Sequence, residues 1–144
     1  MAHEHSGTAK DADYQAAITD LLGVLAYGEL TAFTRMAADS DLAPTLRLKA
    51  DLAGLAAVEY RQFTHLIDRM REMGLEPEAA MQPFVATFEA FHERTAPRTW
   101  LESLLKAYVG DGIAKDFYRE MAALVDPGTE SVMNQALEDE GASV

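Results

Sequence analysis

Apolar residues recur every three or four positions along almost the whole chain, and no stretch alternates apolar and polar residues as a strand does. Such spacing places the apolar side chains on one face of a helix. Residues 129 to about 140 have room for only a short stripe and predict a terminal helical piece. The longer helices are predicted at residues 11–39, 44–73, 77–95 and 98–125.

The breaks between these helices are short. Pro44 and Pro77 suit the first turn of a helix, and Gly74 suits the position just after one. Helices joined by short loops pack as antiparallel neighbours, so the expected fold is an all-α, antiparallel four-helix bundle with a short additional C-terminal helix. We expect residues 1–10 to form a flexible tail and residues 11–144 to form a single domain.

Composition narrows the possible partners. The 144 residues contain no cysteine, which excludes thiolate metal sites and thiol nucleophiles. Lys and Arg number 12 against 24 Asp and Glu, a net charge of −12 that makes nucleic acid an improbable partner. No basic region precedes an apolar run at the start, and no run of apolar residues is long and uncharged enough to span a membrane. These features predict a cytoplasmic protein without a membrane partner.

Three predicted helices carry an acid inside their apolar stripe. Glu29, Glu59 and Asp111 each continue the three-and-four spacing of their helix. Counted from the connecting turns, the three lie within roughly one helical turn of the same depth at about 1.5 Å per residue. A buried, unpaired carboxylate is costly, so these acids need either a cation or hydrogen-bond donors between them.

Both readings of the acids stay open. In the first, the three carboxylates line a metal site, and the glycines beside them allow another backbone to come close. In the second, they sit at the edge of the stripe and accept hydrogen bonds from arginines, from Gln62 or from nearby tyrosines. These tyrosines are Tyr27, Tyr60 and Tyr108.

Several long segments resemble one known family. They include "AYGELTAFTRMAADSDLAPTLRLKADLA", "VDPGTESV" and, most specifically, "KAYVGDGIAKDFYRE". Together they are similar to the actinobacterial branch of ferritin-like proteins, related in turn to the tRNA methylthio-isopentenyladenosine hydroxylases. The resemblance implies a ferritin-like bundle. It also implies a di-iron centre held by carboxylates and by acid-x-x-His pairs, which activates dioxygen for hydroxylation.

The family's ligand pattern is only partly present. The resemblance implies Glu29, Glu59, Asp111 and Asp139 as the metal-ligating acids. The position three residues after Glu59 is Gln62, and the position three residues after Asp139 is Ala142, where the pattern has histidines. An amide is a poor ligand for iron, so the implied iron site is degenerate. The catalytic residues stay unassigned.

Two other histidines are candidates to replace the missing ligands. His65 lies about 120 degrees away from the face of Glu59 at ~100 degrees per residue, which places it on the flank of the helix. Glu89 and His92 have Glu-x-x-His spacing on the third helix and form a reserve ligand pair. His92 lies beside Phe88 and Phe91, and a buried interface histidine explains it equally well.

Two functions therefore remain. The first is a metal-poor ferritin-like protein with a binding role; the alternative is a di-iron hydroxylase that acts on a small molecule or nucleoside. Whether the chain is an enzyme depends on whether a metal centre is retained. The short C-terminal piece covers little of the core, so an apolar face near the end of the fourth helix needs a partner, and we expect a homodimer.

Overall fold

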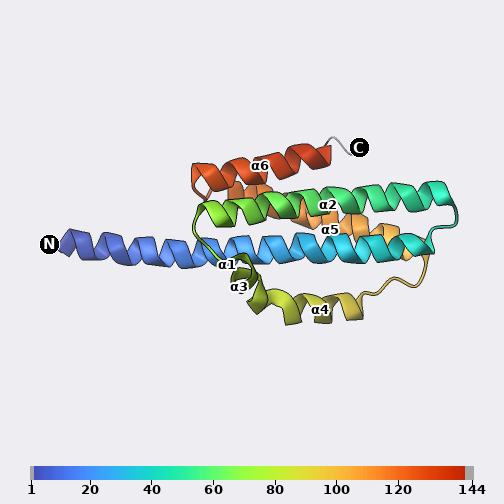
Figure 1. Ribbon diagram of the computed structural model, residues 1–144, viewed down its shortest axis with the longest axis horizontal. Coiled ribbons are helices and arrows are strands. Elements are labelled where there is room, and N and C mark those ends of the chain that lie inside the picture. The colour runs from blue at the N-terminus through green and yellow to red at the C-terminus, as the bar shows by residue number, and fades with distance from the viewer. Residues whose placement is uncertain (1, 142–144) are drawn as a thin grey trace.

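Helices account for almost all of the chain that the structure describes. The computed structural model describes the backbone of residues 2–141 and the side chains of residues 11–138, and no strand occurs there. Two single 3-10 turns, Ser40–Leu42 and Gln82–Phe84, join longer elements. The helices are α1 (Ala2–Asp39), α2 (Leu46–Glu72), α3 (Pro77–Met81), α4 (Val85–Arg94), α5 (Trp100–Ala122) and α6 (Pro127–Gly141) (Figure 1).

The bundle consists of α1, α2, α5 and α6. Helix α1 packs along α2 and against α5, while α6 packs against both α2 and α5. Helices α3 and α4 lie outside this group, against α1, and return the chain along the length of the bundle (Figure 1). As a result α2 and α5 run in the same direction (Figure 1).

The predicted all-α bundle is confirmed, but its membership differs from the prediction. The expected third bundle helix, residues 77–95, is the crossover, interrupted at a 3-10 turn that contains Pro83. Proline lacks a backbone N–H and breaks the regular ladder there. The expected terminal piece is the fourth bundle helix, and its Met133 and Ala136 are part of the core. Helix α1 also begins at Ala2, earlier than the predicted residue 11.

The helix ends follow from local chemistry. The Thr45 side chain accepts a hydrogen bond from the Leu48 N–H at 3.2 Å and begins α2. Gly74, with φ of +75°, lies just after the end of α2, in a conformation that costs glycine little. The Thr99 side chain accepts from the Glu102 N–H at 3.1 Å and begins α5.

The crossover makes its closest contact with α1 at Gly23. A side chain at Gly23 would overlap the backbone carbonyl of Ala80 on α3. Only a residue without a Cβ allows the two helices to come this close. The core beneath the crossover is apolar, and its largest fully buried members include Leu22, Leu66, Met70, Tyr118 and Met133.

Helix α1 is more apolar than predicted, because no segment was expected to be long and uncharged enough to span a membrane. The segment from Asp11 to Leu42, which covers most of α1 and the 3-10 turn after it, is long and apolar enough to cross a membrane by length and composition. The core helix of a bundle passes the same test, and α1 packs against α2 and α5 in this fold. We therefore assign this helix to the bundle core.

Candidate functional site

The centre of the candidate site is Glu29 on α1. Its side chain is buried, with 5% of the residue exposed, as its place in the apolar stripe predicts. The hydroxyl of Tyr118 on α5 donates a hydrogen bond to Glu29 Oε1 at 2.8 Å. Tyr118 is itself 1% exposed, so the bond is shielded from water. A hydrogen bond shielded from water in this way is electrostatically stronger than one at the surface.

The other two acids of the predicted site lie in different surroundings. Glu59 on α2 is only partly buried. Asp111 on α5 forms an ion pair with Lys115 one turn further along, with Oδ2 and Nζ 2.9 Å apart. Among the described side chains, no group of three or more His, Asp or Glu residues could hold a metal ion. Thus Glu29, Glu59 and Asp111 do not make a metal cluster by themselves.

The fourth predicted ligand cannot be placed. The side chain of Asp139 lies outside the described residues, although its backbone belongs to α6. Ala142, at the position of the second missing histidine, lies outside them altogether. The full four-acid ligand set therefore stays a prediction.

Gln62 occupies the position of the first missing histidine. It is 1% exposed, and its Nε2 donates a hydrogen bond to the backbone carbonyl of Ala136 on α6 at 3.1 Å. Gln62 thus joins two bundle helices. The second interpretation of the acids expected it to donate to one of them, but its hydrogen bond goes to a backbone carbonyl instead. An amide nitrogen has no lone pair for a metal. The described residues do not fit a di-iron centre, because neither the imidazole donors nor a cluster of acids is present.

The reserve pair of Glu89 and His92 is split between two environments. Glu89 accepts a hydrogen bond from the Tyr27 hydroxyl at 2.8 Å and forms an ion pair with Arg35 at 3.0 Å. His92 is 7% exposed, and neither ring nitrogen has a hydrogen-bond partner among the described residues. The pair therefore does not act as one site.

The surroundings of His92 favour its neutral form. Burial lowers the pKa of His92 to about 4, and the positive charges of Lys106 and Arg35 act in the same direction. The negative charge of Glu89 opposes them without reversing the shift. His92 is therefore an uncharged interface residue of α4 near neutral pH, packed beside Phe88 and Phe91.

A shallow cleft of about 310 Å³ opens between α1 and α4. Its polar groups are the hydroxyls of Tyr27, Thr31 and Thr34 and the ion pair of Arg35 with Glu89. The volume is at the lower end of the range for small-molecule sites. Two of these hydroxyls already donate within the chain, Tyr27 to Glu89 and Thr34 to the Thr31 carbonyl, so they offer a ligand acceptor oxygens and not free donors.

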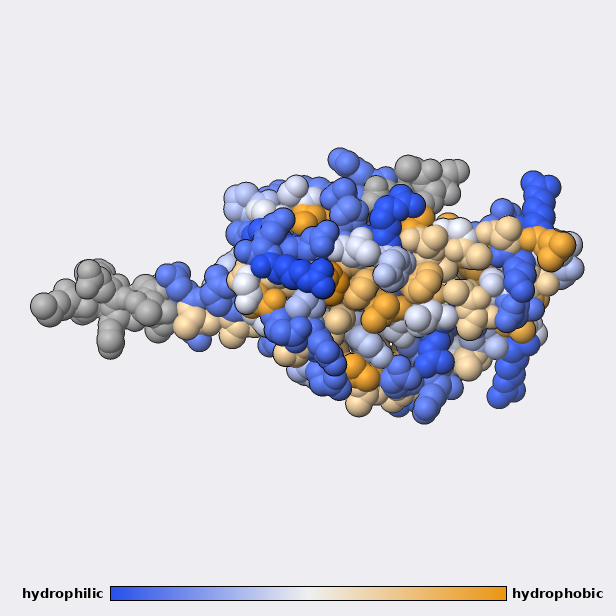
Figure 2. All heavy atoms as spheres, viewed as in Figure 1, coloured by the Kyte–Doolittle hydropathy of each residue, from blue (hydrophilic) through white to orange (hydrophobic). Residues whose placement is uncertain are grey.

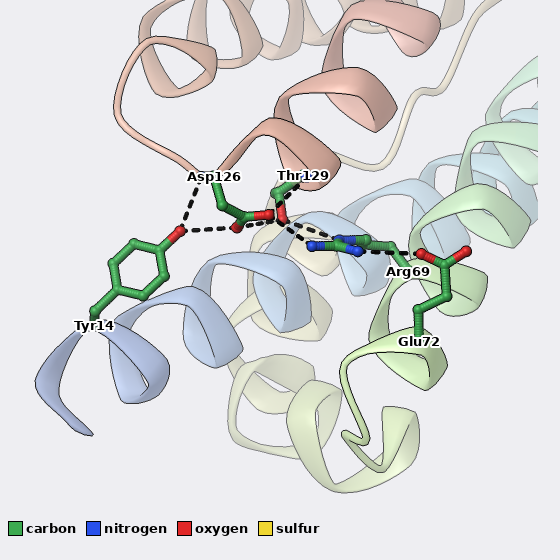
Figure 3. Close-up of polar contacts among 5 residues, drawn as sticks. All are labelled: Tyr14, Arg69, Glu72, Asp126 and Thr129. Carbon is green, nitrogen blue, oxygen red and sulfur yellow. Dashed lines mark hydrogen bonds and ion pairs between the residues drawn. The ribbon is translucent and has the colours of Figure 1, made fainter. Parts of the chain in front are cut away.

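A second polar cluster fixes the start of α6, and the sequence reading missed it (Figure 3). Asp126 Oδ1 accepts hydrogen bonds from the Tyr14 and Thr129 hydroxyls, at 2.8 and 2.9 Å. Arg69 Nη2 lies 2.6 Å from Asp126 Oδ2. The signal was the "DPGT" segment, in which an acid precedes a proline at the first helical position. The cluster joins α1, α2 and α6, so its role is to hold the bundle together.

Comparison with known proteins identifies the class. The chain belongs to the ferritin-like domain family of actinomycetes, whose model matches residues 12–144. No curated protein matches the chain. The family match supports the ferritin-like fold and the actinobacterial branch, while the likeness to hydroxylases of modified tRNA stays a prediction.

Proposed function

We propose that this ferritin-like chain acts as a binding protein, with hydrogen bonds holding its core where relatives of the fold hold two metals. The observation that carries the proposal is the buried bond from the Tyr118 hydroxyl to Glu29. It gives Glu29, the first expected metal ligand, a hydrogen-bond partner on another bundle helix, α5. The bond satisfies one of the two carboxylate oxygens from within the protein, which lowers the cost of burying Glu29 without a cation.

Gln62 supports the same proposal. In place of an imidazole ligand, it binds the Ala136 carbonyl and links α2 to α6. The residue that departs from the family pattern therefore has a structural role of its own. In this proposal the shallow cleft between α1 and α4 is the place for a small ligand, outside the core.

One observation favours the alternative, a di-iron hydroxylase. Gln62 Oε1 is buried and accepts no hydrogen bond from any described residue. A carbonyl oxygen in that state is a weak donor to a metal ion, and it also suits a buried water molecule. Asp139 would complete the acid set of that alternative.

Elemental analysis separates the two functions. The protein is purified without chelators from cells grown with added iron, and iron, manganese and zinc are counted per chain. The binding proposal predicts less than one tightly held transition metal per chain and no oxygen consumption above the protein-free rate when a reductant is added. Two irons per chain would support the hydroxylase and overturn the proposal.

A further inference from the structure

We infer that the outer side of α5 is the surface through which two copies of this chain form a dimer. The surface consists of Leu101, Leu105, Tyr108, Val109 and Ile113 and is called the apolar α5 face below. The exposed fractions of these residues are 74, 61, 79, 48 and 66%, in that order. The inference holds whether or not the core binds a metal.

The apolar α5 face lies opposite the side of α5 that packs into the bundle. The residues that α5 buries are Ser103, Tyr118 and Ala122. At ~100 degrees per residue, the buried and the exposed sets fall on opposite sides of the helix. Large apolar residues on the solvent side of a bundle helix, in a continuous group, mark an interaction surface.

The length of α6 explains why part of the bundle is left uncovered. Helix α5 has 23 residues and α6 has 15, or roughly 35 and 22 Å at the standard rise. Helix α6 follows α5 after a short turn and packs back along it, so about the first third of α5 extends beyond the end of α6 (Figure 1). On the visible face, Figure 2 shows apolar residues gathered over α1 and α2 in the part that α6 does not reach.

The exposed area matches what a dimer needs. Side chains of this size have on the order of 200 Å² of surface each. Together with the partly exposed Leu104 and Phe117, the face presents several hundred Å² of apolar surface per copy. A stable interface buries about 800 Å² per partner, and a typical monomer exposes a largest patch of only ~300–600 Å².

Charge favours a second copy at this face over other parts of the surface. The chain carries 24 acids against 12 Lys and Arg, so two copies repel each other over most of their surface. Helix α5 carries four acids and three basic residues. Lys115 pairs with Asp111, and Arg119 with Asp116, so the charges next to the face are largely neutralised.

Gly112 indicates the register in which two copies of α5 pair. Leu101, Leu105, Tyr108 and Gly112 recur at spacings of four, three and four on one line of the helix. A two-fold axis between Leu105 and Tyr108 pairs these two across antiparallel helices and sets Leu101 opposite Gly112 of the other copy. A Cβ at Gly112 would meet nothing within 4 Å in its own chain. No neighbour within the chain requires this glycine, whereas the proposed partner's leucine fits the space beside it.

The first test is the solution mass. Sedimentation equilibrium at micromolar concentrations should give the chain twice its 15.8 kDa mass. Tyr108→Lys places a charge at the centre of the face and should give the monomer mass with unchanged far-UV circular dichroism. Leu124→Lys is the matched control, because Leu124 is 69% exposed in the turn that follows α5, and it should remain dimeric. A wild-type monomer, or a dimer that Tyr108→Lys leaves intact, would overturn the inference.

The second test is the geometry. Because the chain has no cysteine, Tyr108→Cys introduces a single thiol, about 5 Å along the axis from its copy in the proposed register. Mild oxidation should yield a covalent dimer. Arg119→Cys places the thiols roughly 37 Å apart and should not cross-link. Cross-linking of both variants, or of neither, would refute antiparallel pairing of α5.

Discussion

Tyr118 on α5 donates its hydroxyl proton to Glu29 on α1 across the inside of the bundle, at 2.8 Å. Both residues are almost fully buried, and 89 positions separate them in sequence. The bond joins α1, the first bundle helix, to α5, the third. Apolar packing alone is not directional, whereas this polar contact requires these two residues to face each other. Such contacts fix the alignment of helices as well as their stability.

Removal of this hydroxyl should destabilise the fold. Tyr118→Phe keeps the ring and takes away the donor, so Glu29 Oε1 loses this hydrogen bond in a site closed to water. We expect a loss of about 1–3 kcal/mol in the free energy of unfolding, measured by urea denaturation at pH 7. Tyr60→Phe, on a ring that is 44% exposed, is the control and should change stability by less than ~0.5 kcal/mol. Equal effects of the two variants would show that the buried bond contributes nothing.

The close contact between Gly23 on α1 and Ala80 on α3 predicts unequal effects of two glycine substitutions. Gly23→Ala places a Cβ against the backbone of Ala80, which cannot rotate away as a side chain can. We expect a loss of ~3 kcal/mol or more by thermal or urea unfolding. Gly54→Ala in α2 meets nothing within 4 Å and should stabilise by up to ~1 kcal/mol. If Gly23→Ala is tolerated as well as Gly54→Ala, α3 does not pack on α1 as described.

Asp126 should make stability depend on pH in acid. Burial alone would raise the pKa of Asp126, but the hydrogen bonds from Tyr14 and Thr129 and the positive charge of Arg69 lower it to about 2. The unfolded chain has the higher pKa of 3.8, so it binds the proton first as the pH falls. About 2 kcal/mol of stability, present above pH ~4, should be lost between pH 4 and 2.

Asp126→Asn tests this assignment. The variant should be less stable than wild type at pH 5 and should lose less stability on acidification to pH 2. Asp116→Asn removes a surface acid whose pair with Arg119 is largely exposed, and it should follow the wild-type curve. A wild-type acid dependence in Asp126→Asn would place the titrating group elsewhere.

His92 should add a second pH dependence in a different window. Its pKa is about 4 in the folded chain and 6.5 when unperturbed, so the unfolded state takes up the proton first as the pH falls. Stability should therefore decline from pH 6.5 to 4, by up to about 3 kcal/mol. His92→Phe should lose this part of the pH dependence, and His65→Gln should keep it. The same decline in His92→Phe as in wild type would contradict a buried, neutral His92.

Local patterns predicted the helices well because apolar spacing and helix-capping residues act within a few positions. The membership of the bundle was harder to predict. Residues 77–95 carry apolar residues at helical spacing, and only Pro83 distinguishes them from a continuous bundle helix. Where that segment packs depends on Gly23, about 60 positions away, and on a contact that no local pattern records.

The candidate site was predicted in part. The apolar stripe correctly places Glu29 in the core. Its partner Tyr118 lies in the α5 stripe that also carries Asp111, so the signal was present, but the expected donors were other tyrosines. Asp111 itself pairs with Lys115, because an ion pair one turn away satisfies it without another helix. Which donor reaches an acid depends on helix rotation, which spacing does not fix.

Calorimetric titration with Co(II), a substitute for Fe(II) that is stable in air, tests most directly whether hydrogen bonds have replaced a metal in the core. Wild type should bind less than one equivalent tightly. Gln62→His supplies an imidazole on the helix face of Glu59 and should bind more tightly than wild type, while Gln82→His, at an exposed position, should not. Two equivalents bound tightly by the wild-type chain would contradict the account and favour the hydroxylase.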